Sequence, residues 1–301
     1  FGIPDTASVV PPAGNADFCR FGRRRRMMKM FPNASAVSQE TADRAASSRL
    51  WFLDLLRGIN LISMIAYHGA YDLVYLYGVN LPGYRGLPGY LWQQSICWLF
   101  IFLSGFSFCL GRFHGGRRVK RGLLLTACGL LITAVTALVM PQSLIIMGVL
   151  SFFGLAVLLT ALLYPLFTRI PAPAGLICCL LLFFLTRDVP SGYLGFEGLR
   201  LCALPDFLYR GVFMMILGFP WPGFFSTDYF SLLPWIFLFW SGFFTYRCTP
   251  YGRGLRQWPA FFRHRLCPFL EFIGRHTLPI YMIHQPALMA VFLLAQGIGV
   301  L

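Results

Sequence analysis

Several side chains capable of acid–base chemistry lie within one apolar stretch, Arg49 to Gly78, which reads RLWFLDLLRGINLISMIAYHGAYDLVYLYG. They are Asp54, Arg57, His68, Asp72 and Tyr75. On a helical wheel, at about 100° per residue, all of them fall inside a sector about 60° wide. Ionisable side chains in a membrane helix are costly and usually mark function. The pattern therefore predicts one polar stripe facing the protein interior, with leucine and isoleucine faces turned toward lipid.

His68 and Asp72 are four residues apart, so they are neighbours on one face of a helix. A carboxylate at this spacing can accept a hydrogen bond from the imidazole, which fixes the tautomer of the ring and raises its basicity. That arrangement is typical of general-base or nucleophilic catalysis. The alternative is a buried pair, or a hydrogen bond between packed helices, without a catalytic role.

Asp54 and Arg57 are three residues apart, near the end of the stretch that we expect to face the cytoplasm. They form either an internal ion pair at the membrane edge or an anion site, in which Arg57 binds a phosphate of a cytoplasmic donor. The rise along a helix places Arg57 about 16 Å from His68. A long, thin donor bound at Arg57 would then present its reactive end near His68.

The C-terminal stretch EFIGRHTLPIYMIHQPALM carries a second polar set. Tyr281, His284 and Gln285 fall within about 100° of one another on a helical wheel, and two prolines in the stretch permit local kinks. We predict that His284 and His68 line one cavity, and that Tyr281 and Gln285 line the path to it. A histidine beside a proline is equally compatible with a packing role.

Three further residues complete the candidate site. Arg275, and Arg112 in the basic 112–121 loop, are candidate contacts for donor phosphates, although positive charge at a membrane face also serves as a simple anchor. Asp228, in FFSTDYFSLLPW, precedes an apolar run and is typical of a helix N-cap. Its alternative role is contact with a polar acceptor outside the membrane.

The chain as a whole is too apolar for a soluble domain. Hydrophobic residues make up 57%, charged residues 12%, and the mean hydropathy is +0.66. Because about twenty apolar residues cross a bilayer as a helix, we predict an all-α, multi-pass transmembrane bundle with about seven spans. The predicted spans are 50–77, 92–111, 119–139, 144–168, 173–187, 231–247 and 272–297. The 207–219 segment is too short to span and is predicted to be interfacial or re-entrant.

The net charge of +14 would suggest nucleic acid as a partner in a soluble protein. Here lysine and arginine are concentrated in the N-terminal tail and in the 112–121 and 247–265 loops, so membrane topology explains the charge and no nucleic-acid partner is expected. The positive-inside rule places the N-terminus in the cytoplasm and the 188–230 segment outside. Nine cysteines without a CxxC motif or regular spacing argue against a disulfide framework or a metal site.

Residues 1–48 contain FCRFGRRRRMMKM followed by a polar run, and they lack the apolar core of a signal peptide. We predict a disordered basic tail on the cytoplasmic side, where Arg23 to Arg26 contact anionic lipid or are merely solvated. Residues 49–301 then form the transmembrane domain.

Four stretches, in order, resemble the bacterial branch of the heparan-α-glucosaminide N-acetyltransferase catalytic-domain family. They are RLWFLDLLRGINLISMIAYHGAYDL, WLFIFLSGFSFCLGR, FSTDYFSLLPWIFLFWSGFF and FIGRHTLPIYMIHQP. The first, second and last also resemble the acyltransferase-3 membrane enzymes, which share an LDxLRG…H first helix, a FFxxSGF second helix and a YxxH end. The resemblance covers about 49–297, and the ordered set is more specific than any single motif.

The resemblance implies an integral enzyme of a bacterial cytoplasmic membrane with no permanently bound cofactor. Such enzymes take an acyl group, usually acetyl from acetyl-CoA, at the cytoplasmic side and pass it to a sugar hydroxyl or amine outside. In this sequence His68 matches the first-helix histidine treated as catalytic, Arg57 the arginine of the RG pair, and His284 the C-terminal histidine. One position departs from the pattern: IIMGVLSFFGLAVLL has Ser151 where many bacterial relatives carry a histidine.

Two other functions are compatible with the same residues. A proton-coupled transporter or flippase would use the His/Asp stripe as a proton relay. A non-catalytic membrane partner of a glycan-synthesis complex would need no chemistry at all. The first predicts pH-coupled movement of a substrate without release of CoA thiol, and the second predicts no binding of CoA.

Overall fold

The structure is a computed structural model that describes residues 49–110, 115–251 and 257–299. The predicted disordered tail (1–48) and the candidate donor contact Arg112 lie outside the described residues. Leu50–Leu301 forms a compact unit of its own.

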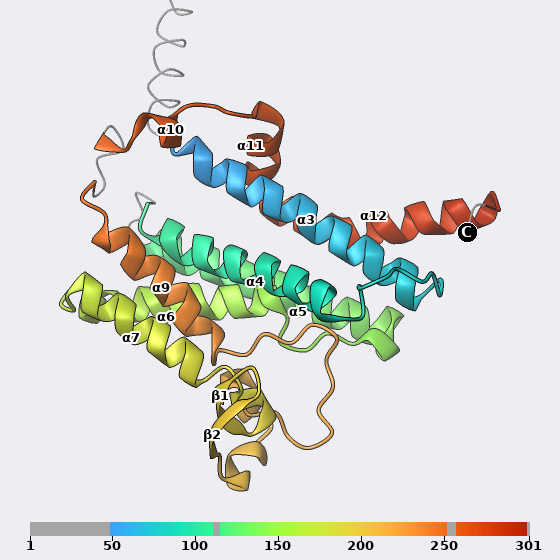
Figure 1. The fold of residues 1–301 in the computed structure, drawn as a ribbon, viewed down its shortest axis with the longest axis horizontal. Helices are drawn as coiled ribbons and strands as arrows, with labels where there is room; N and C mark the ends of the chain where they lie inside the picture. The colour runs from blue at the N-terminus through green and yellow to red at the C-terminus, as the bar shows by residue number, and fades with distance from the viewer. Residues whose placement is uncertain (1–48, 111–114, 252–256, 300–301) are drawn as a thin grey trace, which may run out of the picture. The chain divides into compact units, whose positions relative to one another are not determined.

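Helices dominate the described residues, as the apolar pattern predicts. The long ones are α3 (Trp51–Tyr75), α4 (Leu87–Phe108), α5 (Gly115–Val139), α6 (Val149–Phe167), α7 (Ala172–Leu185), α9 (Trp235–Cys248) and α12 (Thr277–Gly297) (Figure 1). Each range predicted as a span overlaps one of them, so the all-α class is confirmed. Of these helices, α4, α5, α6 and α12 are long and apolar enough to cross a membrane. α3 has the length but carries three charged residues, and α7 and α9 have 14 residues each. Seven spans and a cytoplasmic N-terminus therefore stay predictions.

The last predicted span is broken into two helices. α11 (Pro268–Arg275) ends before His276, and α12 begins after it. Side chains at the break satisfy carbonyl groups at the end of α11. The ring nitrogen Nδ1 of His276 donates to the carbonyl of Phe272 at 2.8 Å, and the hydroxyl of Thr277 donates to that of Gly274 at 2.7 Å. The break lets α11 pack along the start of α3 while α12 crosses α3 nearer its C-terminal end.

A β-hairpin, which the apolar pattern did not predict, lies in the 188–230 segment. β1 (Tyr193–Phe196) pairs antiparallel with β2 (Leu199–Ala203), and Glu197 and Gly198 form the turn between them. Both turn residues have positive φ, 50° and 94°. A two-residue hairpin turn of the favoured hand needs that conformation, which glycine adopts without strain.

The segment predicted to be interfacial, 207–219, holds only single helical turns. These are η3 (Asp206–Tyr209) and α8 (Met214–Leu217), and Phe207 and Phe213 beside them are exposed. Short helices with exposed aromatic side chains fit a segment that does not span.

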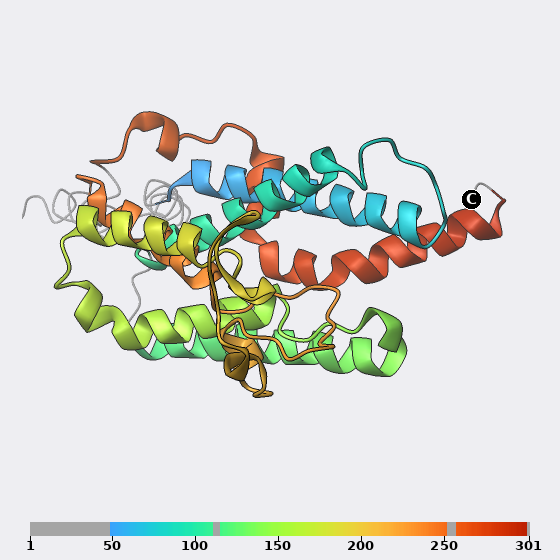
Figure 2. The ribbon, with the colours of Figure 1, turned by 60° about the horizontal axis from the view of Figure 1, so that its bottom comes forward.

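The helices pack as a series of neighbours: α11 on α3, α3 on α4, α4 on α9, and α9 on α7. Figure 2 shows α5 and α6 side by side, and this pair contacts the others through α6 and α9. The core between α4, α6, α7 and α9 is aromatic. Its fully buried aromatic side chains are Phe152, Phe183, Phe239, Phe243 and Phe244.

α4 and α9 carry the same triplet, Ser-Gly-Phe, and each glycine touches the backbone of the other helix. A Cβ atom at Gly105 would lie 1.7 Å from the carbonyl oxygen of Phe239, and one at Gly242 would lie 2.1 Å from that of Phe102. Neither position has room for a side chain. Small residues allow this close approach in membrane helices, where apolar burial alone does not distinguish protein from lipid.

The substitution Gly105→Ala tests this contact. Overpacking of a closed interface costs about 1–3 kcal/mol, so we expect a lower unfolding temperature and a lower yield of monodisperse protein in detergent. The control is Gly116→Ala in α5, where a Cβ atom would meet nothing within 4 Å. Equal unfolding temperatures for the two variants would contradict the proposed role of the α4–α9 contact.

Candidate active site

The structure brings together the two histidines that the sequence places about 200 residues apart. His68 lies on α3 and His284 on α12, and their ring centroids are 5.0 Å apart with an interplanar angle of 60°. The Tyr281 ring lies beside them, 5.2 Å from that of His284. Two imidazoles and a phenol from two crossing helices thus lie close together, and their shared site stays a prediction.

His284 is held in one tautomer by its own helix. Its Nδ1 atom lies 2.5 Å from the backbone carbonyl oxygen of Tyr281. Since a carbonyl only accepts hydrogen bonds, Nδ1 carries the proton, and Nε2 of the neutral ring keeps a free lone pair. That Nε2 atom is buried and has no hydrogen-bond partner among the described residues. The ring therefore presents a base to the site.

Asp72 has a different partner from the one that its spacing suggested. Its carboxylate, in a residue only 1% exposed, accepts from the side-chain nitrogen of Gln285 at 3.0 Å and 2.9 Å. In the described part of the chain, no hydrogen bond joins Asp72 to His68. The reason is the helix crossing: Asp72 points to the amide offered by α12, while the ring of His68 contacts those of Tyr67 and His284. The expected orientation of His68 by Asp72 is therefore replaced by a link between α3 and α12.

An aromatic cluster beside His68 was not identified from the sequence. The Tyr67 ring lies 5.3 Å from those of both Tyr84 and Trp92. The Tyr84 hydroxyl donates to the backbone carbonyl of Tyr67 at 3.2 Å, and burial raises the pKa of Tyr84. The members of this aromatic cluster come from α3, the following loop and α4, so no local spacing in the sequence indicates the cluster. The cluster encloses one side of the helix face that carries His68.

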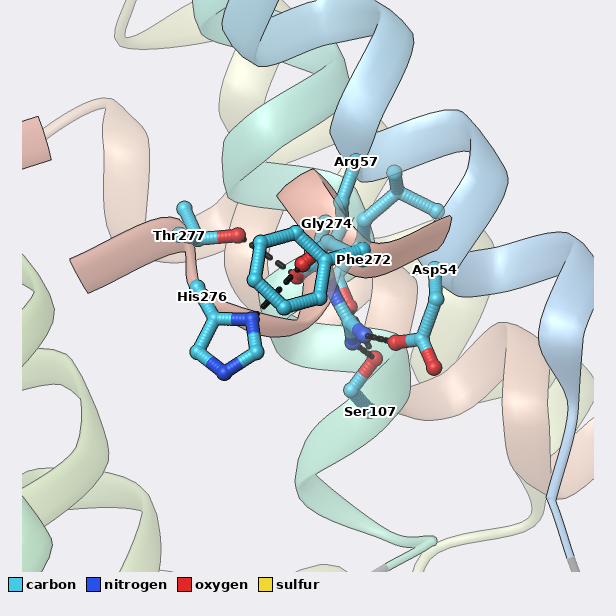
Figure 3. Close-up of polar contacts among 8 residues, drawn as sticks. Asp54, Arg57, Ser107, Phe272, Gly274, His276 and Thr277 are labelled. Carbon is cyan, nitrogen blue, oxygen red and sulfur yellow. Dashed lines mark hydrogen bonds and ion pairs between the residues drawn. The ribbon is translucent and has the colours of Figure 1, made fainter. Parts of the chain in front are cut away.

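The second predicted site is the pair at the start of α3. Arg57 Nη1 lies 2.9 Å from the Asp54 carboxylate, and its Nη2 donates to the hydroxyl of Ser107 on α4 (Figure 3). Asp54 is 3% exposed. The ion pair is therefore present, and a donor phosphate would meet a guanidinium whose charge Asp54 already balances. This contact of Ser107 was not predicted, because a lone serine in an apolar helix does not indicate a functional role.

The break between α11 and α12 lies beside this ion pair (Figure 3). Arg275, the predicted donor contact, is exposed at the end of α11, and its guanidinium lies 5.8 Å from the Trp51 ring of α3. Both predicted cations described here, Arg57 and Arg275, therefore lie toward the first turns of α3. The structure brings them to the same end of the helix.

Glu271 is a buried acid that the sequence analysis passed over. It is fully buried, and its carboxylate accepts from Arg265 Nε at 3.0 Å and from the backbone N–H groups of Leu266 and Cys267 at 2.8 Å and 3.2 Å. Glu271 thus holds the start of α11 in place. The run Cys-Pro-x-x-Glu indicates this role, because it resembles the start of a capped helix.

Asp228 acts as a cap, but of a distant helix. Its carboxylate accepts from the backbone N–H of Val149, the first residue of α6, at 3.3 Å. The neighbouring Ser226 hydroxyl accepts from the N–H of Ile146 at 2.9 Å. Burial raises the pKa of the Asp228 carboxyl to about 6, against the opposing effect of the Val149 N–H. Asp228 is also within electrostatic range of Tyr281, so this loop approaches the site.

Ser151, the position where the resemblance leads us to expect a histidine, lies at a contact between two helices. It is buried, and a Cβ atom added at Gly129 on α5 would lie 2.3 Å from its hydroxyl oxygen. The position is therefore a tight contact between α5 and α6, in which Gly129 has no room for a side chain. Among the described residues, no three His, Cys, Asp or Glu side chains lie together as metal ligands.

Comparison with known proteins gives a family match. Residues 49–286 match the model of the family described as "Heparan-alpha-glucosaminide N-acetyltransferase, catalytic". The matched range begins just before α3 and ends in α12 directly after Gln285, so both histidines lie within it. No curated protein and no solved structure matched the chain.

The raised pKa of Asp228 predicts a pH dependence of stability. Its ordinary value is 3.8, so the folded state binds the proton more tightly, and stability falls as pH rises from about 4 to about 6. Asp228→Asn keeps an acceptor for the Val149 N–H but cannot ionise. We expect its unfolding temperature in detergent to change less over this range than that of the unsubstituted protein. Asp206→Asn, at an exposed acid, is the control and should keep the original slope; an unchanged slope for Asp228→Asn would contradict the assignment.

Proposed function

Because the chain belongs to the heparan-α-glucosaminide N-acetyltransferase catalytic-domain family, a family of membrane acetyltransferases, we propose that it transfers an acyl group from acyl-CoA to a sugar. The donor is acetyl-CoA or another acyl-CoA on the cytoplasmic side. The acceptor is a hydroxyl or amino group of a saccharide or cell-envelope glycan on the outer side of a bacterial cytoplasmic membrane. The observation that carries the proposal is the 5.0 Å approach of the His68 and His284 rings, from the first and last helices of the matched region.

The chemistry needs a base near the acceptor. His68 takes the proton from the acceptor O–H or N–H while the acceptor attacks the thioester carbonyl. The C–S bond breaks, a C–O or C–N bond forms, and the proton passes to the departing CoA thiolate. In the alternative order, His68 first carries the acyl group and the acceptor then removes it. His284 and Tyr281 line the acyl path in both cases.

The position of the donor follows from the two ends of α3. Arg57 and Arg275 would hold the phosphates of acyl-CoA at one end, and His68 lies about 16 Å farther along the helix. This arrangement supports a donor that enters lengthwise with its thioester at the histidines. An apolar, water-poor surrounding then favours transfer over hydrolysis.

Release of free CoA thiol by purified protein in detergent, with acyl-CoA and a panel of amino sugars and glycans, tests the proposal. We expect His68→Ala to lower the rate by at least about 100-fold, because it removes the base. The matched control is His264→Ala, at an exposed histidine outside the site. Full activity of purified His68→Ala would refute the mechanism. pH-coupled substrate movement without thiol release would identify the transporter alternative instead.

The role of Arg57 is tested without leaving the buried carboxylate of Asp54 unpaired. Asp54→Asn keeps the guanidinium and removes its partner, whereas Asp54→Asn with Arg57→Gln removes both charges. Charge-assisted hydrogen bonds contribute about 1.5–3 kcal/mol. The double variant should therefore need at least about tenfold more acyl-CoA for half-maximal rate than the single variant. Equal acyl-CoA dependence in the two variants would show that the pair is only structural.

A further inference from the structure

The side-chain amide of Gln285 has a defined orientation. Both carboxylate oxygens of Asp72 lie within 3.0 Å of the amide nitrogen. An ionised carboxylate only accepts hydrogen bonds, so the NH₂ group must face Asp72 and the carbonyl oxygen must face away. Asp72 therefore fixes the amide with its nitrogen toward α3 and its carbonyl oxygen turned away from the carboxylate.

The carbonyl oxygen of the Gln285 side chain, Oε1, is buried, and it has no hydrogen-bond partner among the described residues. The same is true of Nε2 of His284, the preceding residue. Both atoms are acceptors, because the only ring proton of neutral His284 is on Nδ1. Leaving buried polar atoms unpaired is costly, and native structures do so rarely.

We propose that His284 Nε2 and Gln285 Oε1 form a binding site for two donor hydrogens of the acyl acceptor, and that Asp72 is the positioning residue that keeps Gln285 in this orientation. A primary amino group brings two such hydrogens, as do two neighbouring hydroxyl groups. A carboxylate or phosphate brings none and is excluded. This inference rests on the proposed function, since it assigns the ligand fragment at the same two histidines.

The proposal separates two roles for Asp72. If Asp72 served only to join α3 and α12, loss of the pair would lower stability and leave the choice of sugar unchanged. If it orients the amide, ligand recognition depends on which member of the pair donates. The exchange of donor and acceptor within the pair distinguishes these roles.

The experiment compares Asp72→Asn, Gln285→Glu and the double exchange Asp72→Asn with Gln285→Glu. In Gln285→Glu alone, two carboxylates face each other. In Asp72→Asn alone, the side chain at position 72 can donate as well as accept, so the orientation of the Gln285 amide is no longer fixed. In the exchange, the new amide at position 72 donates to the new carboxylate at position 285, whose second oxygen again faces the site. Gln296→Glu, at an exposed glutamine of α12, is the control.

Ligand-induced thermal stabilisation measures binding without turnover. The probes are glucosamine and glucose, with acetate and sulfate as anions that bring no donor hydrogens. We expect glucosamine and glucose to stabilise the unsubstituted protein and the Gln296→Glu control, with weaker effects from the two anions. Each single variant should need at least about tenfold more sugar for the same shift. The sugar concentration that the double exchange needs for this shift should return to within about twofold of that of the unsubstituted protein.

The inference is overturned if no sugar stabilises the unsubstituted protein, if Gln285→Glu binds sugar normally, or if the exchange stays as impaired as Gln285→Glu. Thiol release from acyl-CoA is measured in parallel on the same proteins. Sugar binding that follows the expected pattern without thiol release would support this site and reject the proposed transfer. Thiol release with no effect of the exchange would reject this site and keep the transfer.

Discussion

A buried carboxylate needs hydrogen-bond donors, and in an apolar bundle those donors must come from other parts of the chain. α3 carries two such acids. Asp54 binds Arg57, which also reaches Ser107 on α4, and Asp72 binds Gln285 on α12. Asp54 is therefore paired within α3 and linked to α4 through Arg57, whereas Asp72 is satisfied by α12. This requirement determines where α4 and α12 cross α3, and the position of the site follows from it.

The same requirement explains why the last span is divided. α11 packs so closely on α3 that a Cβ atom at Gly58 would lie 2.0 Å from the carbonyl oxygen of Leu270, and one at Gly274 would lie 1.8 Å from that of Asp54. A straight continuation of α11 would not follow this contact and also bring Gln285 to Asp72. The break at His276 allows both contacts, and the side chains of His276 and Thr277 satisfy the backbone there.

The remaining helices provide the frame around this polar axis. α4 contacts α3 on one side and α9 on the other, where the two Ser-Gly-Phe triplets bring the backbones together. The aromatic core then fills the space toward α6 and α7. The 188–230 segment contains the hairpin and ends in the loop of Asp228. This residue caps α6 and approaches Tyr281. The frame thus supplies a loop near the histidines as well as rigid support.

The sequence by itself determined where the long helices lie and that α3 carries a polar stripe, although Tyr75, a predicted member of that stripe, is exposed. Apolar runs of spanning length and the helical period are local properties, so they locate α3 and α12 and show that His68 and Asp72 share a face. Only the tertiary structure decided the partners. Asp72 binds a residue 213 positions away, Asp228 caps a helix 79 positions before it, and Ser151 lies against Gly129 of another helix. The physical reason is that periodicity gives the direction of a side chain, whereas its partner depends on which helix crosses there and at what distance.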